Sequence, residues 1–280
     1  MFFIRQTPLR SEEIYLRTIF TIKQTKLSIF KKIIKFVFVT AFWLLIWEAA
    51  SRIVSHENEL LLLILPSPIT VFQKWLEMGF TSEYITAAVF TLSRVFSGFI
   101  IGAVLGFTFG VITHLSEIAN CLISPILKLI RAVPVVAIVI LLYLFFQSNN
   151  LPIIIVCLMV LPIIWQTVYD GLTNTDISLL EMSRIYKIKP TKQLFYIRIP
   201  LIIPSLLTSL VNSLGLAWKS GVAAEVICLP SVSLGTILWS AKGNVDFEQV
   251  YAVTLTVVVL SIVIEILLKF FVKKLLKGRT

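Results

Sequence analysis

Long apolar segments dominate the chain and alternate with short polar ones. Six of them are long enough to cross the hydrocarbon core of a bilayer, which takes about 20 helical residues. The six segments are residues 33–54, 86–113, 121–146, 151–170, 201–227 and 249–272. The pattern predicts an all-α membrane protein with six transmembrane helices.

The polar segment 173–200 lies between the fourth and fifth predicted spans and reads TNTDISLLEMSRIYKIKPTKQLFYIRIP. Its apolar residues recur at steps of about three and four, which indicates an amphipathic helix. These residues are Leu180, Ile185, Ile188, Leu194, Phe195 and Ile197. A short amphipathic loop between two spans is suited to docking onto a soluble partner.

Composition and charge agree with a membrane protein. Hydrophobic residues make up 58% of the chain and charged residues only 14%, whereas soluble domains carry about 25% charged residues. The net charge of +10 does not indicate nucleic-acid binding, because the basic residues cluster in the two ends and in 173–200, as the positive-inside rule predicts. The three loops that we expect on the outer side, 55–85, 147–150 and 228–248, hold only Lys74 and Lys242. We therefore expect both termini and the 171–200 loop to be cytoplasmic.

The chain divides by pattern into three parts. Residues 1–32 form a basic amphipathic tail, interpreted as an interfacial helix on the inner leaflet, with a disordered basic tail as the alternative. Residues 33–272 form the six-span domain, and residues 273–280 form a basic C-terminal tail. The N-terminal region is too long and basic for a cleaved signal peptide.

Catalytic chemistry is not visible in the sequence. It contains no Gly-x-x-x-x-Gly-Lys-Ser/Thr phosphate loop, and we expect the chain to bind no cofactor or metal. The carboxylates inside spans are Glu48, Glu225 and Glu265, and none is expected to have a partner at i+4. Ion-coupled carriers usually contain more intramembrane carboxylates. Because no catalytic group of residues is visible in the sequence, we predict a non-enzymatic membrane protein.

Two spans carry structural signals. Gly98, Gly102, Gly106 and Gly110 recur every four residues, so a neighbouring helix can approach closely along that face. In the third span, Pro134 removes a backbone donor and should bend the helix. Arg131, one or two turns inside the inner edge, either extends to lipid phosphates or faces the mouth of a pathway.

The fifth span is the most polar. Intramembrane polar side chains are costly unless they line water or pair with one another. Asn212, Lys219 and Ser220 are seven and eight residues apart and are expected to share a face. Lys219 and Glu225 are six apart and should not pair within one helix. The candidate pathway residues are Asn212, Trp218, Lys219, Ser220 and Glu225. Hydrogen bonding between helices, or extension of Lys219 and Glu225 towards the membrane edge, is the alternative.

The polar loop resembles the cytoplasmic loop of binding-protein-dependent ABC importer permeases. That family's pattern is Glu-Ala-Ala, three residues, Gly, nine residues, Ile-x-Leu-Pro. Glu181, Ile197 and Pro200 are in register, whereas Met182, Ser183, Lys187 and Ile199 depart from the pattern. Other segments are similar to the nitrate/sulfonate/taurine branch: Leu65-Pro66-Ser67-Pro68, Arg94 with the four glycines, Arg131-Ala-Val-Pro134 and Trp218-Lys219-Ser220-Gly221 with Glu225.

The resemblance implies a type I importer permease in the plasma membrane of a prokaryote. It implies a second permease copy, two ATPase subunits that bind ATP and Mg²⁺, and an extracytoplasmic solute-binding protein. Residues implied to couple to the ATPase are Glu181, Met182, Ser183, Arg184, Ile185, Lys187, Ile188, Lys189, Pro190 and Pro200. Glu181 binds the ATPase in this interpretation, or caps its own helix.

The resemblance also bears on the solute, which would be a small organic anion such as a sulfonate or taurine-like compound, or a vitamin precursor. Two other classes of function remain open from the sequence. One is an ion-coupled secondary carrier, and the other is a membrane scaffold for a cytosolic enzyme.

Overall fold

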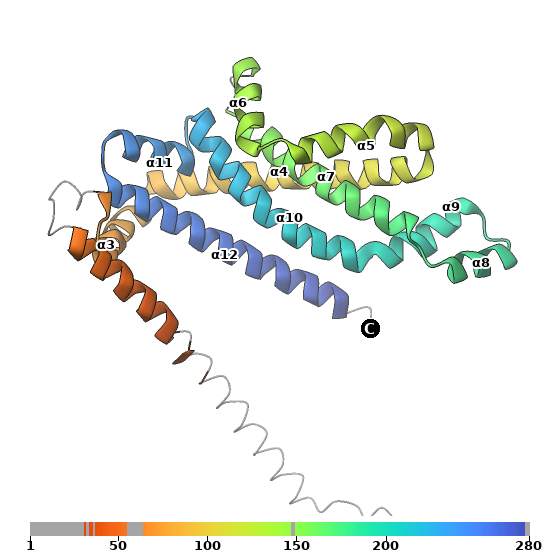
Figure 1. Ribbon diagram of the computed structural model, residues 1–280, viewed down its shortest axis with the longest axis horizontal. Coiled ribbons are helices and arrows are strands. Elements are labelled where there is room, and N and C mark those ends of the chain that lie inside the picture. The colour runs from red at the N-terminus through yellow and green to blue at the C-terminus, as the bar shows by residue number, and fades with distance from the viewer. Residues whose placement is uncertain (1–30, 32–33, 36, 55–63, 147–148, 278–280) are drawn as a thin grey trace, which may run out of the picture. The chain divides into compact units, whose positions relative to one another are not determined.

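The computed structural model describes residues 31, 34–35, 37–54, 64–146 and 149–277, with the side chains of 276–277 excepted. All regular structure in these ranges is helical, as predicted. After the helix Val37–Val54, the elements are α3 Pro68–Gly79, α4 Ser82–Leu115, α5 Glu117–Ala132, α6 Val135–Phe145, α7 Leu151–Thr173, α8 Ile177–Ile185, α9 Pro190–Gln193, η1 Leu194–Arg198, α10 Ile199–Cys228, α11 Leu234–Gly243 and α12 Phe247–Lys277 (Figure 1).

The chain forms two compact units, Met1–Thr70 and Val71–Thr280. In the first, the segment after the helix Val37–Val54 turns back onto it through two hydrogen bonds. Ser51 Oγ donates to Leu65 O at 2.9 Å, and Trp47 Nε1 donates to Pro66 O at 3.1 Å. The predicted N-terminal tail, residues 1–32, lies outside the described residues except for Lys31.

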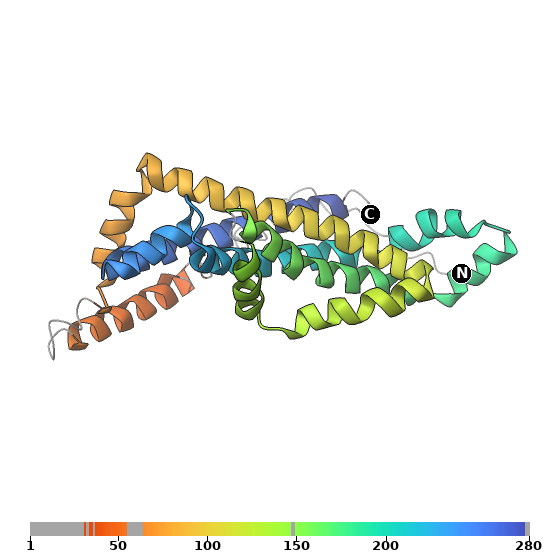
Figure 2. The same cartoon turned by 90° about the horizontal axis from the view of Figure 1, so that it is seen from above.

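The core of the second unit is the α4–α7 pair, which lies side by side in Figures 1 and 2. The four glycines of α4 are buried against α7. A Cβ on Gly98 would lie 2.5 Å from Ile153 O, and one on Gly110 would lie 2.6 Å from Val168 Cβ. The predicted role of these glycines in close helix packing is confirmed, because each occupies a place where any side chain would collide.

The third predicted span, 121–146, is two helices rather than one. α5 and α6 meet at 107° across a short break. Pro134 is the N-cap of α6, and the predicted bend at this proline is confirmed. The bend is sharp enough for α6 to stand across the long helices (Figure 2).

The fifth span begins earlier than predicted. Helix runs without interruption from Pro190 to Cys228, 39 residues, through the π-helical turn η1. Pro200 has no N–H with which to bond the carbonyl four residues earlier, and the preceding Ile199 N–H donates instead to Leu194 O, five residues back. The second half of the polar loop is therefore a rigid extension of α10.

The remaining helices complete the unit. α11 follows α10 through the turn at residues 229–233, and Trp75 Nε1 of α3 donates to Thr256 Oγ1 of α12 at 2.7 Å. α12 continues as helix to Lys277, so the first part of the expected C-terminal tail, 273–280, belongs to this helix.

Candidate functional site

The 171–200 loop begins with a capped helix, α8. Asp176 is its N-cap, and its carboxylate accepts from Ser178 N and Ser178 Oγ, both at 2.9 Å. These hydrogen bonds favour the ionised form and hold the pKa of Asp176 below its usual value. Glu181 lies in the middle of α8, so the alternative in which it caps this helix was wrong.

The end of α8 has a specific turn geometry. Lys187 N donates to Arg184 O, and Ile188 N donates to Ser183 O, both at 2.9 Å. This is a Schellman motif, in which the residue after the C-cap adopts the left-handed conformation that glycine favours. Lys187 occupies that position with a φ of 53°, which explains why the family pattern has a glycine here.

α8 and α9 are braced against each other by Ser183. The Ser183 hydroxyl donates to Leu180 O at 2.7 Å and accepts from Gln193 Nε2 at 2.7 Å. Ser183 is 1% exposed, so this member of the predicted coupling set supports the loop from inside and does not reach its surface.

The other predicted coupling residues lie on the surface of the loop. Glu181 and Ile185 are one helical turn apart on the face opposite Ser183, and Ile185 is 79% exposed. The exposed members are Glu181, Met182, Arg184, Ile185, Lys187, Ile188, Lys189, Pro190 and Pro200. Ile177 and Tyr186, which the sequence analysis did not single out, add further exposed apolar surface at 70% and 74%.

Arg198 fastens the loop to the ends of α4 and α7. Its Nη1 donates to Leu172 O at 3.2 Å and to His114 Nε2 at 2.5 Å, and His114 Nδ1 lies 3.2 Å from Thr173 Oγ1. A guanidinium only donates, so Nε2 of His114 is the unprotonated nitrogen and Nδ1–H donates to Thr173. The junction between the loop and these helix ends is thus held by a chain of directed hydrogen bonds.

The predicted pathway residues of α10 separate into two groups. Asn212 and Lys219 are exposed on one face of the helix, whereas Trp218, Ser220 and Glu225 are buried. Trp218 Nε1 donates to Val257 O of α12 at 3.0 Å, and Ser220 Oγ donates to Leu216 O of its own helix at 2.9 Å. Ser220 therefore does not share the exposed face expected for it.

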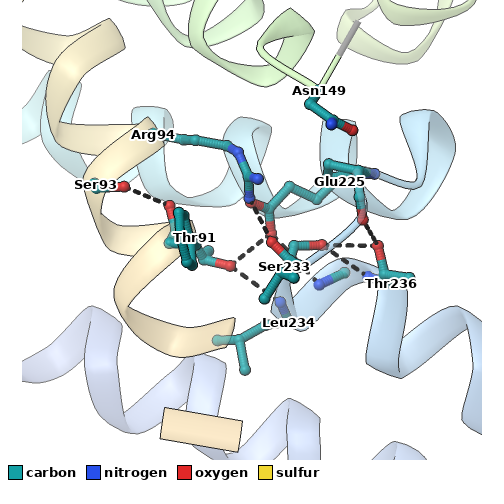
Figure 3. Close-up of polar contacts among 12 residues, drawn as sticks. Thr91, Ser93, Arg94, Asn149, Glu225, Ser233, Leu234 and Thr236 are labelled. Carbon is teal, nitrogen blue, oxygen red and sulfur yellow. Dashed lines mark hydrogen bonds and ion pairs between the residues drawn. The ribbon is translucent and has the colours of Figure 1, made fainter. Parts of the chain in front are cut away.

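Glu225 forms a buried ion pair that sequence reasoning missed. Arg94 Nη1 of α4 lies 3.1 Å from Glu225 Oε1 and also donates to Val232 O at 2.8 Å. Thr91 Oγ1 donates to Glu225 Oε2 at 2.8 Å and accepts from Leu234 N at 3.0 Å (Figure 3). Glu225 is 0% exposed, so the alternative in which it extends outward was wrong, while the absence of a Lys219–Glu225 pair is confirmed.

The other two carboxylates within spans have partners that the sequence analysis did not assign. Glu48 pairs with Arg52 at 2.6 Å, and Glu265 pairs with Lys269. Both pairs are at i,i+4, so the expectation of no such partner was wrong. Both pairs are partly exposed on one helix each, unlike the Arg94–Glu225 pair, which joins α4, α10 and the start of α11.

Comparison with known proteins places these features in a family. The family described as "Binding-protein-dependent transport system inner membrane component" matches residues 98–277. The putative aliphatic sulfonates transport permease protein SsuC of Bacillus subtilis is 25% identical over 217 residues, which cover 77% of this chain and 78% of that protein. The bicarbonate transport system permease protein CmpB of Synechococcus elongatus is 28% identical over 153 residues, covering 54% and 55%.

Solved structures share the fold. A chain of the inward-facing MetNI methionine ABC transporter matches with a TM-score of 0.59 and 18% identity, covering 70% of this chain and 95% of that one. A chain of an amino acid ABC transporter matches with a TM-score of 0.61 and 18% identity, covering 71% and 98%.

These matches confirm the resemblance drawn from the loop and its flanking spans, and they do not favour the secondary carrier or the scaffold. The family match includes the glycine-lined helix, the polar loop and α10 within residues 98–277. The chain therefore belongs to the family of binding-protein-dependent transport system inner membrane components and is a multi-pass permease subunit of an ABC importer.

Proposed function

We propose that two copies of this chain form the membrane part of the importer. Two ATPase subunits bind the 171–200 loops on the cytoplasmic side, and a solute-binding protein docks on the other side. ATP and Mg²⁺ bind to the ATPase subunits, and this chain performs no chemistry of its own. The family description, which names a binding-protein-dependent system, supports this division of labour.

The observation that carries the proposal is the construction of the loop. Apolar side chains of α8 and of the turn after it point outward, among them Ile185 at 79% exposed and Tyr186 at 74%, while Ser183 and Gln193 are hydrogen-bonded to each other inside the loop at 2.7 Å. The loop then continues without a break into α10. A surface that is exposed, apolar and stiffly joined to a membrane helix is suited to transmitting movement of a bound ATPase between two discrete states.

The solute pathway is proposed to follow the exposed face of α10, between the two copies. Asn212 and Lys219 lie on this face, and a cation there favours an anionic solute. Similarity to SsuC, a putative aliphatic sulfonates permease, supports a sulfonate or taurine-like anion, with a vitamin precursor as the alternative. A Lys219→Met variant should keep normal membrane levels but alter the dependence of transport on solute concentration.

The coupling role is tested by Glu181→Ala combined with Ile185→Asp. Removing a buried apolar anchor from an interface often costs about 2 kcal/mol or more, roughly a thirtyfold loss of affinity. We expect the variant to insert and dimerise normally but to lose the ATPase on co-purification and to lose ATP hydrolysis stimulated by the binding protein.

A matched control is Glu117→Ala with Ile118→Asp at the start of α5. It changes the same residue types at exposed positions outside the loop, where Ile118 is 75% exposed. The control should retain the ATPase. If a stoichiometric amount of the ATPase co-purifies with the loop variant and its stimulated ATP hydrolysis is undiminished, the loop is not the coupling element.

A further inference from the structure

A cavity of about 390 Å³ lies at the end of the second unit away from the 171–200 loop. It is open to one side and is bordered by the end of α3, the start of α4, α11 with the turn before it, and the start of α12. Its lining includes Glu83, Tyr84, Ser233, Thr236, Ser240 and Asn244. Ligand sites range over about 300–1,000 Å³, so this cavity has room for one or two side chains or a small solute.

The charge of the cavity favours a cation. Glu83 is the acidic residue in the lining, which includes no Lys, Arg or His. Two nearby cations of the described residues are engaged elsewhere: Lys74 pairs with Asp246 at 3.2 Å, and Lys242 lies 5.2 Å from the ring centroid of Trp239. Hydroxyl and amide oxygens on the walls can accept hydrogen bonds from an ammonium or guanidinium group.

One wall of the cavity is hydrogen-bonded to the residues of the buried ion pair. Val232 and Ser233 belong to the lining, and Val232 O accepts from Arg94 at 2.8 Å. The next residue, Leu234, donates through its N–H to Thr91 at 3.0 Å, and Thr91 donates to Glu225 of α10. An occupant would therefore touch a turn that is fastened to α10, the helix that continues into the 171–200 loop.

The identity of the occupant follows from charge and position. An anionic solute is repelled by Glu83, and the cavity lies on the face where the charge distribution places the extracytoplasmic side. We propose that this cavity receives a lysine or arginine side chain of the solute-binding protein. The inference rests on the proposed function, because it names the contact through which that partner docks.

The cavity alone is tested with charged thiol reagents on Ser240→Cys, in a chain whose Cys121, Cys157 and Cys228 are replaced by alanine. Relative to their rates with a free thiol in solution, the trimethylammonium methanethiosulfonate should modify this cysteine roughly tenfold faster than the sulfonate form, the size expected for one carboxylate a few ångströms away. Adding Glu83→Gln should remove the difference, whereas the control Glu248→Gln, a carboxylate on the same side outside the lining, should preserve it.

The partner is tested with the solute-binding protein of the same importer, added in excess to the assembled transporter. It should protect the Ser240→Cys thiol, and Glu83→Gln should weaken its binding by roughly tenfold. A Thr236→Trp variant, which fills the cavity, should weaken binding at least as much. Equal reagent rates with and without Glu83, or full affinity in both variants, would overturn the proposal.

The outcomes separate this inference from the proposed function. If the binding protein stimulates ATP hydrolysis by the wild-type transporter and binds Glu83→Gln and Thr236→Trp with unchanged affinity, the cavity is not the docking site. The proposed importer assembly would then stand. A thiol that is already unreactive in the permease alone would show that the chain itself fills the cavity. Protection by the free solute, without its binding protein, would assign the cavity to the solute. Either result would overturn the proposal.

Discussion

The α4–α7 pair and the 171–200 loop are built on opposite principles. Along α4, glycines allow the backbone of α7 to approach until no side chain fits. Arg94 of α4 forms a buried ion pair with Glu225 of α10. In the loop, polar groups are satisfied internally by Asp176, Ser183 and Gln193, while apolar side chains remain exposed. The first region is complete within one subunit, whereas the second needs another protein to bury its surface.

The largest expected effect comes from breaking the buried pair. Glu225→Gln leaves the Arg94 charge buried without a counterion, which typically costs ~3–5 kcal/mol. Thermal unfolding of the purified subunit in detergent would measure the loss. Replacing both residues by methionine should recover much of it, because no uncompensated charge remains.

The control for the buried pair is Glu265→Gln, which removes a partly exposed i,i+4 pair of α12 and should change the unfolding temperature little. Equal losses for Glu225→Gln and Glu265→Gln would show that the buried pair contributes no more than an exposed one.

A glycine substitution should distinguish the closely packed α4–α7 pair from the rest of the subunit. In Gly98→Ala, the new methyl group would lie 2.5 Å from Ile153 O, and such overpacking costs ~1–3 kcal/mol. The matched control is Gly215→Ala in α10, where nothing lies within 4 Å of the new methyl. The control should gain roughly 0.5–1 kcal/mol, since alanine favours helix over glycine. Similar unfolding temperatures for the two variants would contradict the close packing.

A smaller effect is expected where the loop joins the membrane helices. Arg198→Met removes the bonds to His114 and Leu172 O, each worth about 1 kcal/mol. Amide hydrogen exchange should rise in residues 190–198 while α7 stays protected. Lys192→Met, an exposed cation of α9, serves as the control and should leave exchange unchanged; a rise in both variants would argue against a specific anchor.

The smallest effect concerns the turn after α8. Lys187 holds a φ of 53°, a conformation that costs a non-glycine residue ~1 kcal/mol or slightly more. Lys187→Gly should therefore slow amide exchange at Ile188 by up to about fivefold, whereas Lys189→Gly, at a φ of −58°, should not. Faster exchange in Lys187→Gly would show that the lysine side chain itself stabilises the turn.

Sequence reasoning succeeded where the signal was local. The four-residue spacing of Gly98, Gly102, Gly106 and Gly110 predicted a close helix contact, and Pro134 predicted a bend. Both depend on backbone rules that act within a few residues. Asp176 could have been found in the same way, since an Asp directly before a helix is a common N-cap.

The missed features are those that depend on tertiary structure. Arg94 and Glu225 are separated by 131 residues. Helical periodicity does not show which polar face of one helix packs against which polar face of another. For the same reason, spacing grouped Ser220 with Lys219, although packing buries the serine and leaves the lysine exposed.

The direction of α4 and α7 has a consequence for the path of the chain. Gly98 lies against Ile153, and Gly110 against Val168, so residue numbers rise together and the two helices are parallel. The chain must therefore return across the bilayer between them, and only the bent pair α5–α6 is available for that return. Counted as one crossing, the pair brings the candidate crossings of the described residues to six. An even number of crossings is what the expected placement of both basic ends on the cytoplasmic side needs.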